Sequence, residues 1–339
     1  MNAHPDTPEP DDRPHLDSTL VRRLVAGQFP AWADLPVRPL AAGGWDNRTF
    51  HLGDAMTVRL PSAPGYAAQV AKEQRWLPYL APRLPLPVPV PLGWGRPAEG
   101  YPFEWSVYRW IDGRQATPER IADLTVFATD LAGFLTALHR VDPAGGPAAG
   151  PHTCWRGGPL RTYDGEIRAV IARSAGRFPV DPVTRIWAAA LTSTWSGPPV
   201  WFHGDVAFGN LLVRDGRLAA VIDFGVCGVG DPACDLTIAW TLLDTPARTA
   251  FRAALGVDAG TWARARGWAL WKALITLDNP DPARAAEATT PSPRSWPSTT
   301  TAPGPPPCPV DPAPNHLGRR DRTGRSLEKG WSGPSGSRR

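Results

Sequence analysis

The chain has 339 residues, of which 42% are hydrophobic, so it can bury a sizeable core, and we expect two lobes rather than one compact unit. It has no run of about 18 apolar residues, and its first 14 residues are acidic and rich in proline, so neither a membrane span nor a signal peptide is expected. The net charge of +4 comes from residues 281–339, with nine Lys/Arg against five Asp/Glu. The other residues carry 27 of each sign, which excludes the basic footprint of a nucleic-acid-binding domain.

The four cysteines are scattered along the chain and form no C-x-x-C pair. This spacing argues against a zinc site and against a disulfide framework. It fits a reducing compartment, and we expect a cytoplasmic protein.

The first part of the chain is predicted to contain most of the strands. Residues 1–14 are expected to be disordered, and a helix capped by Asp17 or Ser18 follows them. The predicted strands cover residues 37–40, 48–52, 56–60 and 101–111. Gly43 and Gly44 lie between the first two strands, where backbone N–H groups could approach a phosphate closely. The pair alone fits an ordinary hairpin equally well.

A cation and a carboxylate follow one another in this region. Arg59 ends the strand 56–60, and Glu73 lies in a helix expected over residues 66–80. If the two side chains face each other, they would hold the phosphates of a nucleotide. The alternative is that they are two unrelated, solvated charges. Lys72 is the competing cation, but its place beside Glu73 on the helix points it elsewhere.

The aromatic strand 101–111 leads into a short linker. A hinge there would present backbone groups, around Arg109 and Ile111, to the edge of an adenine or guanine. The same residues also fit the last strand of a sheet, and both interpretations can hold together.

From Pro118 onward the apolar periodicity is helical. The predicted helices cover residues 118–139, 165–174, 182–195, 232–243 and 261–277. After about residue 278 the periodicity disappears and Pro, Ser, Thr, Gly and Arg dominate. We interpret residues 278–339 as a disordered tail, or as sequence read out of frame from a GC-rich gene.

Polar residues interrupt apolar, strand-like sequence at two places, His203 to Asn210 and Ile222 to Gly225. Two short strands joined by an Asp-Gly turn at 215–216 connect them. This hairpin would carry Asp223 back beside Asn210 and Asp205. Three oxygen-bearing side chains would then meet, which suits Mg²⁺ and a phosphate-bearing substrate.

The motif H-G-D-x-x-x-x-N at His203–Asn210, followed by I-D-F-G with Asp223 and by G-D-P with Asp231, resembles the aminoglycoside phosphotransferase family. The resemblance covers residues 18–277. It implies an α+β, two-lobed, protein-kinase-like fold. A nucleotide-binding lobe with an antiparallel sheet would span residues 15–111, and a mainly helical catalytic lobe residues 112–277, followed by the disordered tail.

The resemblance implies transfer of the γ-phosphate of ATP or GTP to a hydroxyl of a small molecule, such as an aminoglycoside or a macrolide. Asp205 would be the base, and Asn210 and Asp223 would bind Mg²⁺. Arg59, where the family commonly has lysine, would contact phosphates and pair with Glu73.

The segment from Gly43 to Asn47, including Gly44, would cover those phosphates. The expected partner is a small-molecule hydroxyl acceptor, with no nucleic acid and no membrane; the sequence does not predict the oligomeric state.

Two other functions remain open. The chain could be a non-catalytic, nucleotide-binding or truncated relic of this family, which an out-of-frame tail would favour. A protein kinase is disfavoured because Gly204 follows His203 and because no activation segment is visible between Asp223 and Asp231.

Overall fold

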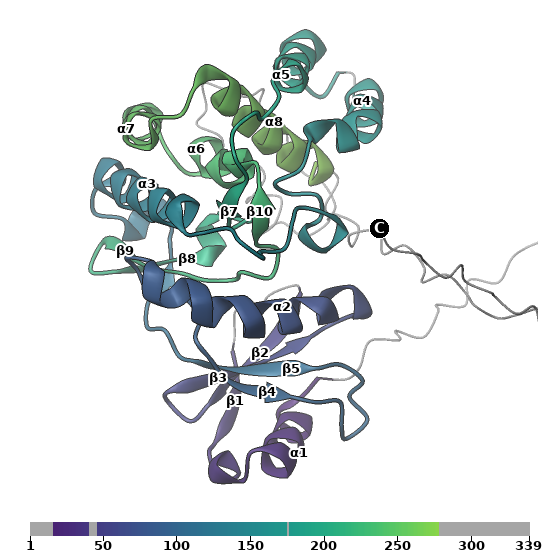
Figure 1. The fold of residues 1–339 in the computed structure, drawn as a ribbon, viewed down its shortest axis with the longest axis vertical. Coiled ribbons are helices and arrows are strands. Elements are labelled where there is room, and N and C mark those ends of the chain that lie inside the picture. The colour runs from purple at the N-terminus through teal and green to yellow at the C-terminus, as the bar shows by residue number, and fades with distance from the viewer. Residues whose placement is uncertain (1–15, 41–45, 175, 278–339) are drawn as a thin grey trace, which may run out of the picture. The chain divides into compact units, whose positions relative to one another are not determined.

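The computed structural model describes residues 16–40, 46–174 and 176–277. The described chain contains an antiparallel sheet formed by its first part and a mainly helical part that follows (Figure 1). This is the two-lobed α+β architecture that the sequence predicts. The expectations for residues 1–14, for Gly43 and Gly44, and for residues 278–339 fall outside the described residues.

The sheet has five strands in the order β1-β2-β3-β5-β4, and every neighbouring pair is antiparallel. Its strands are β1 (Val37–Pro39), β2 (Asn47–Leu52), β3 (Met56–Pro61), β4 (Pro91–Gly95) and β5 (Trp105–Arg109). The sequence does not predict β4, because its proline and two glycines have low strand propensity. Pairing with β5 forms it.

Two helices accompany the sheet, α1 (Ser18–Gln28) and α2 (Pro64–Leu80). As predicted, the Asp17 carboxylate caps α1 by accepting from the amide of Leu20 at 2.7 Å. Val58 and Leu60 of β3 belong to the same buried cluster as the apolar face of α1. Since alternate residues of a strand point to opposite faces, Arg59 points to the other face.

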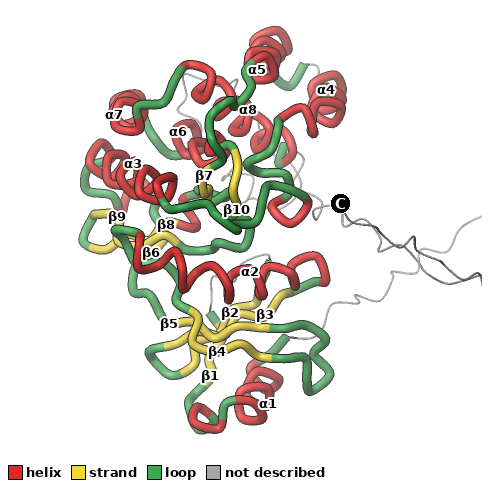
Figure 2. The backbone as a smooth tube through the Cα atoms, in the orientation of Figure 1, coloured by secondary structure: helices red, strands yellow, loops and turns green. Residues whose placement is uncertain are grey.

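The second part of the chain contains most of the helices (Figure 2). Its helices are α3 (Leu124–Arg140), α4 (Asp164–Arg173), α5 (Val180–Thr192), α6 (Ile238–Thr241), α7 (Thr245–Leu255) and α8 (Ala259–Ile275). Its short strands are β6 (Arg114–Gln115), β7 (Val200–Phe202), β8 (Leu211–Arg214), β9 (Arg217–Val221) and β10 (Gly228–Gly230). Helix α3 starts six residues later than predicted, because Asp123 caps it through the amides of Thr125 and Val126.

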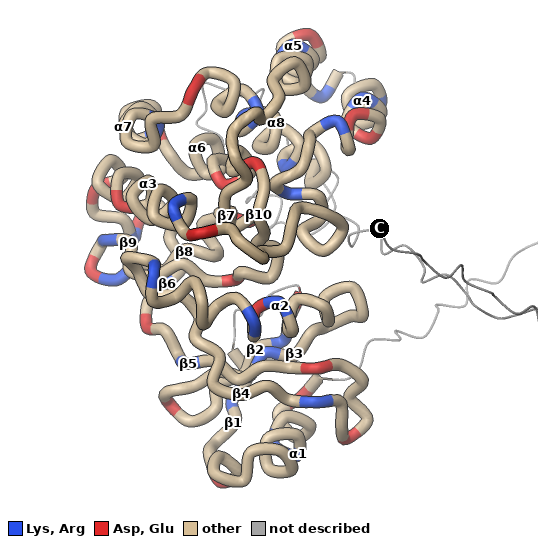
Figure 3. The backbone as a smooth tube through the Cα atoms, in the orientation of Figure 1, with Lys and Arg blue, Asp and Glu red and all other residues tan. Residues whose placement is uncertain are grey.

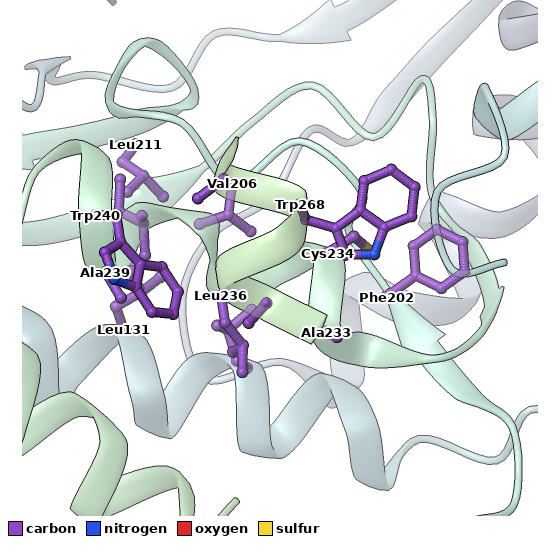
Figure 4. Close-up of a cluster of buried hydrophobic side chains, with 14 of the residues drawn as sticks. Leu131, Phe202, Val206, Leu211, Ala233, Cys234, Leu236, Ala239, Trp240 and Trp268 are labelled. Carbon is purple, nitrogen blue, oxygen red and sulfur yellow. The ribbon is translucent and has the colours of Figure 1, made fainter. Parts of the chain in front are cut away.

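A continuous apolar core fills the helical part (Figure 4). Phe202 of β7, Val206 of the following loop and Trp268 of α8 are at most 1% exposed. The loop that carries the polar motif is therefore built on a rigid, buried base.

Lys/Arg and Asp/Glu are interspersed along the described backbone (Figure 3). Within the described residues, no helix is both long and apolar enough to span a membrane.

Candidate active site

A buried carboxylate organises the turn that follows β7. Asp235 is fully buried, and its two oxygens accept hydrogen bonds from the backbone amides of His203 at 2.8 Å and Gly204 at 2.7 Å. Burial raises the pKa of Asp235, against the lowering effect of His203 and these amides. Asp235 therefore braces this loop through the backbone.

Gly204 is required by the geometry of this turn. Its φ of +87° lies in the left-handed region, and a Cβ there would meet the carbonyl oxygen of Val226 at 2.7 Å. Glycine therefore lets the loop reverse direction against the segment that follows Asp223.

His203 links the two polar motifs. Its Nδ1 accepts a hydrogen bond from the amide of Asp205 at 3.2 Å, which leaves Nε2–H to donate to the carbonyl of Ile222 at 3.0 Å. Because both ring nitrogens are engaged with the backbone, His203 supports the loop.

Asp205 has two side-chain partners. The amide nitrogen of Asn210 donates to its backbone oxygen and to Oδ2, both at 3.0 Å, and the ammonium of Lys272 lies 3.1 Å from Oδ1. Partial burial by itself would raise the pKa of Asp205, but Lys272 and Arg156 hold it well below the ordinary value. The carboxylate is therefore ionised at neutral pH, as a proton acceptor must be.

The hairpin β8–β9 forms with its turn at Asp215 and Gly216, both at positive φ. The amide of Ile222 donates to the carbonyl of Asn210 at 2.9 Å, which places Asp223 next to Asn210. Asp223 itself has a φ of +69°, a conformation that aspartate tolerates better than most residues. The structure thus brings the predicted trio of Asp205, Asn210 and Asp223 together.

Arg59 connects the sheet to this trio. One guanidinium nitrogen lies 3.2 Å from Oδ1 of Asp223, and the other lies 3.7 Å from Oε1 of Glu73. Asp223 is therefore the closer partner, whereas the sequence predicts only the pair with Glu73. Burial tends to lower the pKa of Arg59, but Asp223 and Glu73 raise it above the ordinary value.

Tyr108 of β5 is a contact of Glu73 that sequence reasoning missed. Its hydroxyl donates to Oε2 of Glu73, and both side chains are buried. The strand alternation of β5 could have indicated that Tyr108 points toward α2, but not toward which residue.

Three other described residues are predicted to contact the nucleotide, and they lie in different surroundings: Asn47, Arg109 and Ile111. Asn47, the first residue of β2, is buried. The amide of Arg109 donates to the carbonyl of Val90 at 3.0 Å, so it is already used within the sheet. Ile111 lies in the connection between β5 and β6 and is half-buried. The hinge roles of Arg109 and Ile111 stay predictions.

Lys72 points away from Arg59, as expected. Its ammonium donates to the carbonyls of Cys227 and His152, both at 3.1 Å. Burial lowers its pKa. Lys72 therefore ties α2 to two loops of the helical part.

The donor set beside Asp205 suits a hard cation. Asn210 uses its amide nitrogen on Asp205 and keeps its amide oxygen, and Asp223 supplies a carboxylate. Burial, and then the charge of Asp223, raise the pKa of nearby Asp46 to about 6, which indicates crowded negative charge. No group of three or more His, Cys, Asp or Glu able to hold a metal occurs among the described residues. One carboxylate and one amide oxygen fit Mg²⁺, which takes few protein ligands and completes its shell with phosphates and water.

The chain has the protein-kinase-like fold. Its characteristic features are the antiparallel sheet, the mainly helical part and the trio of Asp205, Asn210 and Asp223. The model of the phosphotransferase enzyme family (APH) matches residues 37–268, which is well over half of the chain. The chain belongs to that family.

Solved structures support the fold. Wild-type aminoglycoside 2'-phosphotransferase-IIIa in its GDP complex is 18% identical, with a TM-score of 0.61 over 80% of this chain and 96% of that one. The streptomycin–ATP complex of APH(2")-IIa is 16% identical, with a TM-score of 0.52 over 78% and 93%. Macrolide 2'-phosphotransferase MphH from Brachybacterium faecium is 24% identical, with a TM-score of 0.53 over 81% and 97%. No curated protein matches the sequence.

Proposed function

We propose that this protein transfers the γ-phosphate of ATP or GTP to a hydroxyl group of a small molecule. One observation carries the proposal: Asp205, Asn210, Asp223 and Arg59 form one connected polar group, although three separate segments supply them. Such a group offers a base, two oxygen ligands and a cation to a phosphoryl transfer, which depends mainly on positioning and charge neutralisation.

Asp205 is the proposed base. The acceptor oxygen forms a bond to the γ-phosphorus, the bond from that phosphorus to the β,γ-bridging oxygen breaks, and the nucleoside diphosphate leaves with the electron pair. The hydroxyl proton goes to Asp205, whose pKa is held low, so it orients the hydroxyl and takes the proton late. Asn210 keeps the carboxylate in place through Oδ2.

Asn210 and Asp223 are the proposed ligands of Mg²⁺, which would neutralise charge on the phosphate oxygens when bound. Arg59 is the proposed phosphate contact. It lies between Glu73 and Asp223, and those two carboxylates orient its guanidinium. One of the similar solved structures is a GDP complex and another an ATP complex, so both nucleotides belong in the test.

The test is transfer of label from [γ-³²P]ATP and [γ-³²P]GTP to a panel of hydroxyl compounds, in the presence of Mg²⁺. We expect turnover by the wild type and a loss of about 10²–10⁴-fold in Asp205→Asn. Asp215→Asn, at the exposed turn of the hairpin, is the matched control and should keep full activity.

Nucleotide binding is measured separately, as the rise in melting temperature that ATP or GTP causes. Retained stabilisation with no turnover on any acceptor would favour the non-catalytic relic instead. Full activity of Asp205→Asn would contradict the role of Asp205.

A further inference from the structure

A small hollow lies directly beside Asp205. It has a volume of about 10 Å³, close to the minimum that holds one water-sized group. Its wall includes Arg156, Asp205, Cys234, Trp268, Trp271 and Lys272. On the proposed function, the reacting hydroxyl approaches Asp205, so the chemistry of the residues around this carboxylate bears on the acceptor.

The wall carries more positive than negative charge. Lys272 of α8 lies 3.1 Å from Oδ1 of Asp205, so one cation balances the only carboxylate among the described lining residues. Arg156 is the second cation. It forms no ion pair with any described residue, and its guanidinium carbon lies 5.2 Å from the centre of the Trp271 ring. Beyond its longer-range effect on the pKa of Asp205, this second positive charge therefore has no carboxylate in direct contact among the described residues.

The rest of the wall is mostly apolar and buried. Trp268 is 1% exposed and Trp271 6% exposed, and Tyr163 packs on Trp271 with ring centres 4.9 Å apart. It is completed by the buried thiol of Cys234, by Gly204 and by Thr237, whose hydroxyl donates to the carbonyl of Val206. Charges that are partly buried among such residues are screened less than fully exposed ones, so Arg156 attracts an anionic group that binds beside it.

We infer that the acceptor carries an acidic group, such as a carboxylate, close to the hydroxyl that is phosphorylated. This rests on the proposed function and specifies its substrate class. An acidic group would pair with Arg156 and share Lys272 with Asp205, forming charge-assisted hydrogen bonds. A polyamine, such as an aminoglycoside, would instead bring ammonium groups against two cations and meet a single carboxylate that is already paired.

Arg156 and Lys272 could alternatively stabilise the phosphoryl group during its transfer. The two roles differ in how they depend on the charge of the acceptor. Help to the phosphate would act equally on every acceptor, whatever its charge. Recognition of the acceptor would act only on acidic ones. Comparing each acid with its own uncharged amide separates the two roles, because the amide keeps the hydroxyls and the shape.

The experiment measures binding by calorimetry to the full chain saturated with Mg²⁺ and a non-hydrolysable ATP analogue. The probes are a panel of hydroxycarboxylates, their primary amides, and the polyamino sugars kanamycin and streptomycin. We expect at least one acid to bind about tenfold or more tightly than its amide, as a charge-assisted contact predicts. Arg156→Gln and Lys272→Gln should reduce that preference to about threefold or less.

Arg252→Gln is the matched control. Arg252 also stacks on a tryptophan, with its guanidinium carbon 5.2 Å from the Trp262 ring, but it belongs to α7 and does not line the hollow. It should keep the full preference for the acid. Melting temperatures of all three variants verify that they fold.

Three results would overturn the inference: polyamino sugars that bind more tightly than every acid, acids that bind no better than their amides, or no detectable binding of any acid. Label transfer from ATP, measured on the same panel, tests the proposed function separately. An acid that binds with the expected preference but is never phosphorylated would contradict the proposed function and leave the binding class standing. Label transfer to a polyamino sugar and to no acid would contradict the inferred binding class and leave the proposed function standing.

Discussion

His203 and Asp235 are 32 residues apart in the chain, and the carboxylate of Asp235 accepts the backbone amide of His203 at 2.8 Å. The second carboxylate oxygen accepts the next amide, that of Gly204, at 2.7 Å. One buried side chain therefore binds the backbone amides of the two residues that precede Asp205.

Replacing Asp235 by Asn should weaken this brace. The amide NH₂ of asparagine would face one of the two backbone N–H groups, so one buried donor loses its acceptor. We expect a loss of about 1–3 kcal/mol in the free energy of unfolding, with a lower kcat as Asp205 loses its position. Urea unfolding and label transfer measure the two effects, and Asp215→Asn is the control. An unchanged free energy of unfolding would show that the amides find other partners.

The buried ion pair of Asp231 and Arg264 should be a major determinant of stability. The two side chains are 8% and 6% exposed, and Nε of Arg264 lies 2.7 Å from Oδ2 of Asp231. Arg264→Met leaves a buried carboxylate unpaired, which typically costs about 3–5 kcal/mol. The control is Arg217→Met, which breaks a 2.8 Å pair with Asp130 in which the arginine is 64% exposed. It should cost about 1 kcal/mol or less. Equal losses in urea unfolding would contradict this account.

His139 should make the stability depend on pH. Burial lowers its pKa from 6.5 to about 4, and its Nε2 is buried with no hydrogen-bond partner among the described residues. The unfolded chain takes up a proton near pH 6.5 and the folded chain does not. The contribution is therefore complete above pH 6.5 and is lost as the pH falls toward 4.

Between pH 7 and pH 5 this group alone should cost the wild type about 2 kcal/mol. The glutamine of the variant His139→Gln does not titrate. Between pH 7 and pH 5 the free energy of unfolding of the variant should therefore fall by about 2 kcal/mol less than that of the wild type. Urea unfolding at both pH values gives the comparison. Parallel losses in the two proteins would show that His139 is not the group responsible.

Glu73 should couple stability to nucleotide binding. In Glu73→Ala the hydroxyl of Tyr108 loses its acceptor and Arg59 keeps only Asp223. We expect a loss of about 1–3 kcal/mol in the free energy of unfolding. The KM for the nucleotide should rise about tenfold, because Arg59 is less firmly oriented.

The control for Glu73 is Glu99→Ala, which removes a 3.1 Å pair with Arg23 whose two side chains are 45% and 51% exposed. It should change neither quantity measurably. A normal nucleotide KM in Glu73→Ala would contradict the proposed role of Arg59.

The sequence alone determined the features that depend on neighbouring residues. The β8–β9 hairpin follows from two apolar strands and an Asp-Gly turn, and it brings Asp223 next to Asn210 without help from the rest of the fold. The cap of α1 by Asp17 is equally local. These structures are predictable because a few bonds and dihedral angles limit what such segments can form.

Only the tertiary structure decided which distant residues meet. Lys272 is 67 residues from Asp205, and Tyr108 is 35 residues from Glu73. Such contacts depend on how α8 and β5 pack, which is set by many weak apolar contacts and not by any short pattern. The residues proposed as base, metal ligands and phosphate contact could therefore be singled out from motifs, whereas the charge of the wall beside Asp205 could not.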